Sequence, residues 1–181
     1  MSTVARVIVG AIGSPGSLRA LRYAQHLARD LDATLVPVLA WLPPGGDLAD
    51  RHTPDDELRR IWAQHAHQKL QDALNLAWGR PPTDPRVRPL VRRGHPGPVL
   101  ADAACRPGDL LVVGAGRRGA FAPIAGGRVS RYCLAHAPCP VLAIPPTPLA
   151  HQARRGALAR AFWHRTLNSG QISPGKREAT A

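Results

Sequence analysis

The chain has 181 residues, 44% of them hydrophobic, so it is long and apolar enough to fold around a core without disulfides or a metal. This hydrophobic content excludes a wholly disordered chain. The chain carries 24 lysines and arginines against 12 acids, which gives a formal charge of +12. The excess of cations suggests an anionic ligand or surface, although a coding bias toward arginine, alanine and proline would produce the same charge.

The cysteine pattern and the first apolar run indicate in which cellular compartment the protein is found. Cys105, Cys133 and Cys139 form neither a paired motif nor a zinc-binding spacing. An odd number without a framework is typical of a reducing compartment, and we expect Cys105 and Cys133 to act as small apolar residues. The first apolar run, residues 4–12, is too short to cross a membrane and lacks the flanks of a signal peptide. The sequence therefore predicts a cytoplasmic protein without a membrane span.

The chain begins with two apolar runs separated by a helical pattern. Residues 4–10 are largely β-branched and end in a glycine-rich turn, which indicates a buried parallel strand. We expect Ser17 to cap the following helix. Residues 34–40 predict a second buried strand, in which Pro37 cannot donate a ladder hydrogen bond.

The middle of the chain continues this alternation. Residues 42–52 are rich in proline and glycine and predict a loop. A cap, a proline and an acid then predict a long helix over residues 53–78. Residues 87–91 are polar at alternate positions, as in an edge strand. A short helix over residues 98–105 leads to an apolar strand over residues 109–114, the most central in character.

The last part of the predicted domain is a glycine- and arginine-rich loop, a helix over residues 127–136 and a strand over residues 140–144. The alternation of strands and helices predicts an α/β, Rossmann-like fold: a five-stranded parallel sheet with helices on both faces. Ligands of such sheets bind beyond the carboxyl ends of the strands. We expect a domain over residues 1–147 and a basic extension over residues 148–181, partly helical and then disordered.

Catalytic motifs are missing from the sequence. It contains no nucleophile elbow, zinc-protease motif or phosphate-binding P-loop, and its eight histidines are scattered. Gly114, Gly116 and Gly119 match the dinucleotide pattern GxGxxG, but no acid follows to hold a ribose. The sequence therefore predicts a protein that is not an enzyme, without catalytic or metal-ligating residues.

Residues 110–177 contain no acid, while Arg117 and Arg118 lie in the glycine-rich loop and Arg128 lies at the start of a helix. Helix N-termini favour anions, so this segment indicates a phosphate-bearing ligand. A solvated basic surface explains the same residues, and the sequence leaves both interpretations open.

Several segments together resemble the universal stress protein family. They are the turn after the first strand (VGAIGSPGS), the run Arg93 to Pro96, the strand over residues 109–114, and the segment HAPCPV near the end of the domain. The resemblance covers residues 4–145. It implies an adenine-nucleotide-hydrolase-like fold, a homodimer paired through the last strand, and stress-linked, mostly non-enzymatic roles.

The resemblance also implies a site for ATP or another adenine nucleotide, built on a G-x2-G-x9-G-[ST] loop. Gly114 and Gly127 match its first and third glycines, Arg117 replaces the second, and Arg128 replaces the closing serine or threonine. Ile12 stands where the family usually has an acid near the ribose. If the site is retained, its residues are Gly10, Ala11, Ile12, Val38, Gly114, Gly116, Arg117, Gly119, Gly127, Arg128, Val129 and Ser130.

These departures leave two interpretations open. A side chain at Arg117 adds bulk where backbone approaches phosphate, and the loss of the acid removes a hydrogen-bond acceptor and a possible Mg²⁺ ligand. The first interpretation is therefore a degraded or altered adenine-nucleotide site in a non-catalytic dimer. In the second, Arg128 and Arg117 are themselves the phosphate ligands.

Assembly and rival functions complete the expectations. The last strand is apolar and would be an exposed edge in a monomer, which predicts a homodimer paired through it. Its residues are Val141, Leu142, Ala143 and Ile144. A slow ATP hydrolase would need a nucleophile, a general base and metal carboxylates, and the glycine-rich loop has none of them. A nucleic-acid binder using the basic tail lacks a recognised motif and has few aromatic residues for stacking.

Overall fold

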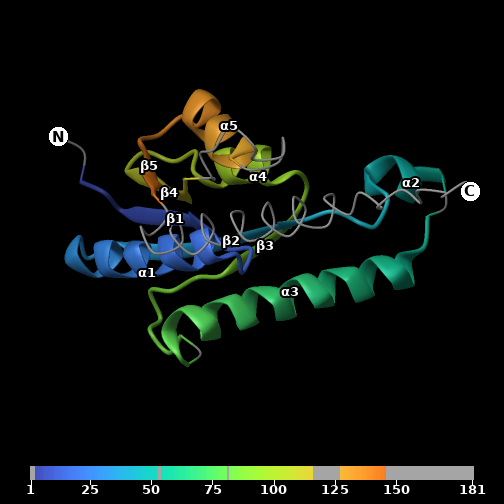
Figure 1. Cartoon of the computed structure of the whole chain (residues 1–181), viewed down its shortest axis with the longest axis horizontal. Coiled ribbons are helices and arrows are strands. Elements are labelled where there is room, and N and C mark those ends of the chain that lie inside the picture. Colours follow the sequence, from blue (N-terminus) through green and yellow to red (C-terminus); the bar gives the residue numbers. More distant parts are fainter. Residues whose placement is uncertain (1–2, 53, 81, 116–126, 146–181) are drawn as a thin grey trace, which may run out of the picture. The chain divides into compact units, whose positions relative to one another are not determined.

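The apolar runs of the sequence form parallel strands, and the segments between them form helices (Figure 1). The structure is a computed structural model that describes residues 3–52, 54–80, 82–115 and 127–145. The elements in chain order are β1 (Arg6–Gly10), α1 (Pro15–Asp30), β2 (Thr34–Trp41), α2 (Gly46–His52), α3 (Asp56–Trp78), β3 (Leu90–Arg93), α4 (Pro96–Ala103), β4 (Asp109–Gly114), α5 (Arg128–His136) and β5 (Val141–Ile144).

The five strands lie in the order β3-β2-β1-β4-β5, and every pair is parallel. This arrangement confirms the predicted α/β fold with a five-stranded parallel sheet. The middle strand is β1, so the expectation that residues 109–114 would be the most central is wrong by one place. The strand order reverses between β1 and β4, and ligands of such sheets bind beyond the carboxyl ends at that switch point.

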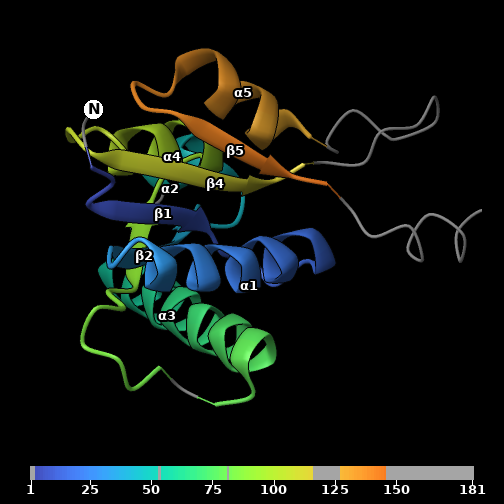
Figure 2. The same cartoon turned by 90° about the vertical axis from the view of Figure 1, so that its left-hand side faces the viewer.

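Helices cover both faces of the sheet, as predicted (Figure 2). On one face α1 and α3 pack together over a core that includes Leu21, Leu70 and Leu74. On the other face α4 and α5 pack together over Leu100 and Cys133. Among the helices of the described part of the chain, none is both long and apolar enough to cross a membrane.

The cysteines behave differently from one another. Cys133 is fully buried between α4, α5 and the sheet, and burial raises the pKa of its thiol to about 11, so it acts as a small apolar residue. Cys105 is exposed beyond the end of α4, so its expected role in the core is wrong.

Pro37 lies in the middle of β2, and the pairing of the neighbouring strand explains why it is tolerated. The N–H and the carbonyl of Leu35 both form hydrogen bonds with the segment before β3. Because alternate residues of a strand face the same neighbour, the nitrogen of Pro37, which carries no hydrogen, also faces this segment. Pairing there is interrupted: Val87 forms only an isolated bridge with Leu35, and β3 begins at Leu90. The predicted edge strand is therefore present but starts three residues later than expected.

The helix starts differ from the expectations in which residue caps them. Ser14, not Ser17, caps α1, and its hydroxyl accepts the N–H of Ser17 at 3.2 Å. Asp55 caps α3 by accepting the N–H groups of Glu57 and Leu58. Thr53, the cap expected from the sequence, lies outside the described residues.

Residues 46–52 form the helix α2 where a loop was expected. The reason is tertiary. Asp50 is buried and accepts hydrogen bonds from Arg59 of α3 and Arg93 of β3, and Arg93 also binds Asp47. The partners of this cluster are distant in sequence, so the local pattern of residues 42–52 did not reveal the helix.

The amino ends of β1 and β4 are joined by a buried ion pair. The guanidinium of Arg6 donates to both carboxylate oxygens of Asp109, at 2.8 and 2.6 Å, and also to the carbonyl of Ala103. The N–H of Arg106 donates to the same carboxylate. The Asp109 side chain is fully buried, so these donors satisfy a charge that water cannot reach.

Candidate functional site

The carboxyl end of β1 forms a tight turn into α1. The N–H of Ala11 donates to the carbonyl of Val38 at 2.8 Å, which ties the turn to β2. The predicted site residue Val38, whose backbone would meet adenine according to the family resemblance, is only 1% exposed, and its carbonyl already accepts the N–H of Ala11. Gly13 has a φ of +77°, the left-handed conformation that lets the chain enter α1. Between them Ile12 projects a side chain that is 49% exposed.

Two of the predicted site glycines have packing roles. A Cβ at Gly114 would lie 2.8 Å from the carbonyl oxygen of Gly16, because the first turn of α1 packs directly onto the end of β4. A Cβ at Gly10 would lie 3.1 Å from Leu100 of α4. Both glycines therefore allow close contact between a helix and a strand, whether or not a ligand binds nearby.

The start of α5 carries the remaining described residues of the predicted loop. Gly127 precedes the helix with a φ of +92°, a conformation that strongly favours glycine. Arg128 is the first helical residue and is exposed. Val129 packs against the core on the α4–α5 face, and the buried Ser130 donates its hydroxyl to the carbonyl of Gly127 at 3.1 Å. The site residues Gly116, Arg117 and Gly119 lie outside the described residues.

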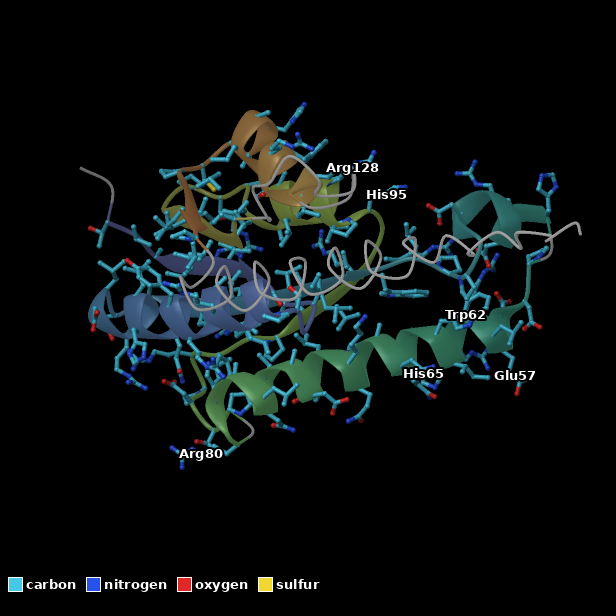
Figure 3. The ribbon with its side chains drawn as sticks, viewed as in Figure 1. Glu57, Trp62, His65, Arg80, His95 and Arg128 are labelled. Atoms are coloured by element: carbon cyan, nitrogen blue, oxygen red, sulfur yellow. The ribbon has the colours of Figure 1, made fainter. Side chains whose placement is uncertain are left out.

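His95 is a neighbour of this region that belongs to the run Arg93 to Pro96 of the family resemblance but was not predicted as a site residue. It precedes α4 as the N-cap residue, makes no side-chain capping bond and is exposed. Figure 3 shows His95 and Arg128 at the same edge of the molecule, at the starts of α4 and α5. Two helix N-termini, an imidazole and a guanidinium therefore face the edge where parallel sheets bind ligands.

A second feature of this edge is an apolar groove between the carboxyl ends of β1 and β2 and the helix α3. Its volume is about 360 Å³. Its principal lining residues are Ile12, Trp41, Leu42, Trp62, His65 and Lys69. Sequence reasoning missed it, because Trp62 was considered only as part of the long helix predicted over residues 53–78. The spacing of Trp62, Ala66 and Lys69, which share one helical face, is the signal that could have found it.

The residues fit an adenine nucleotide only in part. The start of α5, with Gly127 in the left-handed conformation and an exposed arginine, suits a phosphate group. The turn after β1 does not suit a ribose, because Ile12 supplies no acceptor and Gly114 already contacts Gly16. Within residues 3–115 and 127–145, apart from positions 53 and 81, no three acids, histidines or cysteines gather as metal ligands would.

The comparisons with known proteins agree on a family. Residues 4–145 match the sequence profile of the universal stress protein family. Among curated protein sequences, none matches this chain significantly.

Two solved structures are similar in fold. A universal stress protein from Lactobacillus plantarum has 20% identity and a TM-score of 0.58, and the match covers 80% of this chain and 99% of that chain. A universal stress protein solved in complex with cAMP has 24% identity and a TM-score of 0.50, over 81% of this chain and 100% of that chain.

Proposed function

Because the chain belongs to the universal stress protein family, we propose that it is a non-catalytic, stress-related homodimer with an altered adenine-nucleotide site. The phosphate half of the site keeps a suitable backbone at the start of α5, whereas the ribose half has lost its polar ligand. The protein then acts through conformation or partner binding, and adenine nucleotides bind weakly.

The observation that supports this proposal most strongly is the side chain of Ile12. It stands at the end of β1, where the family resemblance places an acid, and half of it is exposed at the ligand edge. A ribose bound there would lose water from its hydroxyl groups without gaining a carboxylate acceptor. A polar group that is desolvated without a partner opposes binding by about 1–3 kcal/mol.

Arg128 supports a second candidate function, an ATP-binding protein that holds phosphate with Arg128 and Arg117. Arg128 is exposed at the first position of α5, where a guanidinium and the helix N-terminus act on the same anion. In this alternative the arginines replace the hydrogen bonds of the family's serine or threonine.

Equilibrium titration calorimetry with ATP, ADP and cAMP, with and without Mg²⁺, separates the two candidates. For an altered site we expect an ATP Kd no better than about 0.1–1 mM, or roughly −4 to −5.5 kcal/mol. Restoring the family pattern with Ile12→Asp, Arg117→Gly and Arg128→Ser together should strengthen binding. cAMP belongs in the panel because one solved structure of similar fold contains it.

The second candidate predicts a different result. ATP would bind at micromolar concentration, and Arg128→Ser alone would weaken binding by about 1.5–3 kcal/mol, the scale of a lost charged hydrogen bond. Arg131→Ser is the matched control, because Arg131 is an exposed arginine of the same helix. Tight ATP binding that none of these substitutions changes would contradict both candidates.

The proposed dimer pairs β5 with its twofold copy. Among the described residues β5 is an edge strand, and Val141, Leu142 and Ala143 are only half-buried. An apolar edge with free ladder groups is stabilised by pairing with another chain. We expect light scattering to give a dimer at about tens of micromolar, the range of weak association, and Val141→Lys to give a monomer. A wild-type monomer at that concentration would contradict the dimer.

The proposal also treats residues 148–181 as an extension that the domain does not need in order to fold. Removing residues 151–181 should leave the unfolding transition of the domain unchanged, because the described sheet ends with β5. A truncated chain that no longer folds would contradict the proposed division into residues 1–147 and 148–181.

We assign the protein to the cytoplasm because its three cysteines form no paired pattern.

A further inference from the structure

The groove between β2 and α3 has the composition of a small-molecule site. Its volume of about 360 Å³ lies in the range of ligand pockets, which are mainly apolar and aromatic with a few polar groups. Two of the four tryptophans of the chain, Trp41 and Trp62, line it, and both are half-buried. Figure 3 shows Trp62 on the side of α3 that faces the end of β2. Two indole rings at one opening favour a planar, apolar ligand.

Ile12 extends the apolar surface of the groove to the switch point of the sheet. It belongs to neither of the two buried clusters that form the core of the described residues, yet it lines the groove with half of its side chain exposed. Core packing therefore does not account for a large aliphatic side chain here. Contact with an apolar ligand would remove this surface from water, which is the main favourable contribution to binding in such a site.

The charge at the rim indicates what else the ligand carries. Lys69 and His65 are the ionisable side chains among the described lining residues, and no acid is found among them. Within the described part of the chain Lys69 forms no ion pair, whereas the nearest acid in sequence, Asp72, accepts a bond from Gln68. An ammonium group beside an apolar groove pairs with a carboxylate that reaches the rim.

We propose that this groove binds an aromatic carboxylate, a flat molecule of one or two rings. Its rings lie against Trp41, Trp62 and Ile12, and its carboxylate pairs with Lys69. This inference goes beyond the proposed function. The groove shares Ile12 with the ribose half of the proposed nucleotide site, but the rest of its lining comes from β2, the segment after it and α3, whereas the phosphate-type features lie at α4 and α5.

The test is titration calorimetry of the full chain with 2-naphthoate. We expect saturable binding with a Kd below about 1 mM. Lys69→Glu should weaken it about tenfold, since it removes an attractive charge and adds a repulsive one. Arg60→Glu makes the same change of charge on the same helix at an exposed residue that does not line the groove, and it should change the Kd less than about twofold.

The neutral analogue 2-naphthalenemethanol separates the charge from the rings. Its affinity should be the same for the wild type and for Lys69→Glu. Trp62→Ala should weaken both compounds by about tenfold through lost stacking and contact area, whereas Leu58→Ala, at an exposed leucine of α3 outside the groove, should weaken neither.

Three results would overturn the proposal: no saturable binding of 2-naphthoate, equal losses in Lys69→Glu and Arg60→Glu, or tighter binding of octanoate than of 2-naphthoate. These titrations contain no nucleotide. Failure of ATP to bind as expected therefore contradicts the proposed function alone, and failure of 2-naphthoate contradicts this inference alone.

Discussion

The two edges of the sheet differ in how their side chains are used. At the amino edge, the guanidinium of Arg6 and the buried carboxylate of Asp109 join β1 to β4, and the N–H of Arg106, between α4 and β4, also donates to this carboxylate. At the carboxyl edge, the same two strands end in glycines, and the prominent side chains around them, Ile12, His95 and Arg128, are exposed. For β1 and β4, the amino ends are therefore joined by side-chain bonds, whereas the side chains around the carboxyl ends lie in solvent.

This difference indicates where the fold tolerates substitution of side chains. The groups that hold β1 and β4 in register lie at the edge away from the candidate site. At the carboxyl edge, the fold constrains the backbone, through the conformation of Gly127 and the close approach at Gly114, and leaves side chains such as Ile12 and Arg128 free to vary. The chemistry of the site can therefore change without loss of the fold.

The largest expected effect is at the amino edge. Arg6→Ala leaves the carboxylate of Asp109 buried without its cation, and we expect a loss of about 3–5 kcal/mol in the free energy of unfolding, measured in urea. The control is Arg86→Ala, at a solvent-exposed ion pair with Asp32, which should lose less than about 1 kcal/mol. Similar losses in the two variants would remove the contrast between the edges.

Gly114→Ala tests the backbone constraint at the carboxyl edge. The new Cβ would lie within 3 Å of the carbonyl group of Gly16, and α1 cannot withdraw without losing its packing. We expect a loss of about 1–3 kcal/mol in the same measurement. In Gly16→Ala the Cβ meets no atom within 4 Å, so that variant should be at least as stable as the wild type. An unchanged stability of Gly114→Ala would refute the close approach.

The charged cluster around Asp50 should make the stability of the fold depend on pH. Hydrogen bonds from Arg59, and then from Arg93, hold the pKa of this carboxyl below its usual value despite its burial. A lowered pKa stabilises the folded state above the ordinary pKa of about 3.9, and this stabilisation disappears as the pH falls through the folded-state value.

Asp50→Asn should therefore be less stable than the wild type at pH 7, and thermal unfolding should show the difference shrinking below about pH 4. Asp72→Asn is the control, because this exposed carboxylate contacts a glutamine and no arginine among the described residues. A difference between Asp50→Asn and the wild type that stays constant from pH 7 to the acid limit would contradict the stabilising role of the charged cluster.

Ile12→Asp should have the smallest effect on stability. Half of the side chain is already in water, so the apolar burial that is lost amounts to about 1 kcal/mol or less in the free energy of unfolding. The same variant should weaken binding of 2-naphthoate. A loss as large as that of Arg6→Ala would show that Ile12 belongs to the core and that the two edges are alike.

The sequence predicted the parts of the molecule whose cause is local. The run over residues 109–114 forms a strand with those bounds, because its apolar residues are bounded by an acid and a glycine. The start of α5 was predicted to within one residue, because Gly127 marks a change of backbone conformation. The resemblance to the universal stress proteins added the family, and residues 4–145 match it.

The parts that could not be predicted depend on contacts between distant residues. The helix α2 exists because Asp50 reaches Arg59 and Arg93, and nothing in residues 42–52 alone indicates this. The groove requires Trp62 of the predicted long helix to lie at one opening with Trp41, which falls between the predicted strand over residues 34–40 and the predicted loop over residues 42–52. The site residues Gly116, Arg117 and Gly119 remain predictions.

The proline in β2 has a consequence for the order in which the sheet opens. It separates the pairing of β2 with its outer neighbour into an isolated bridge at Val87 and a ladder that begins at Leu90, so the two pieces do not support each other. The amide protons that bond across this side should exchange with solvent through local opening, well before those between β1 and β4. Since β2 stays paired with β1 when β3 separates, the wall that carries Trp41 persists while the outer strand opens and closes.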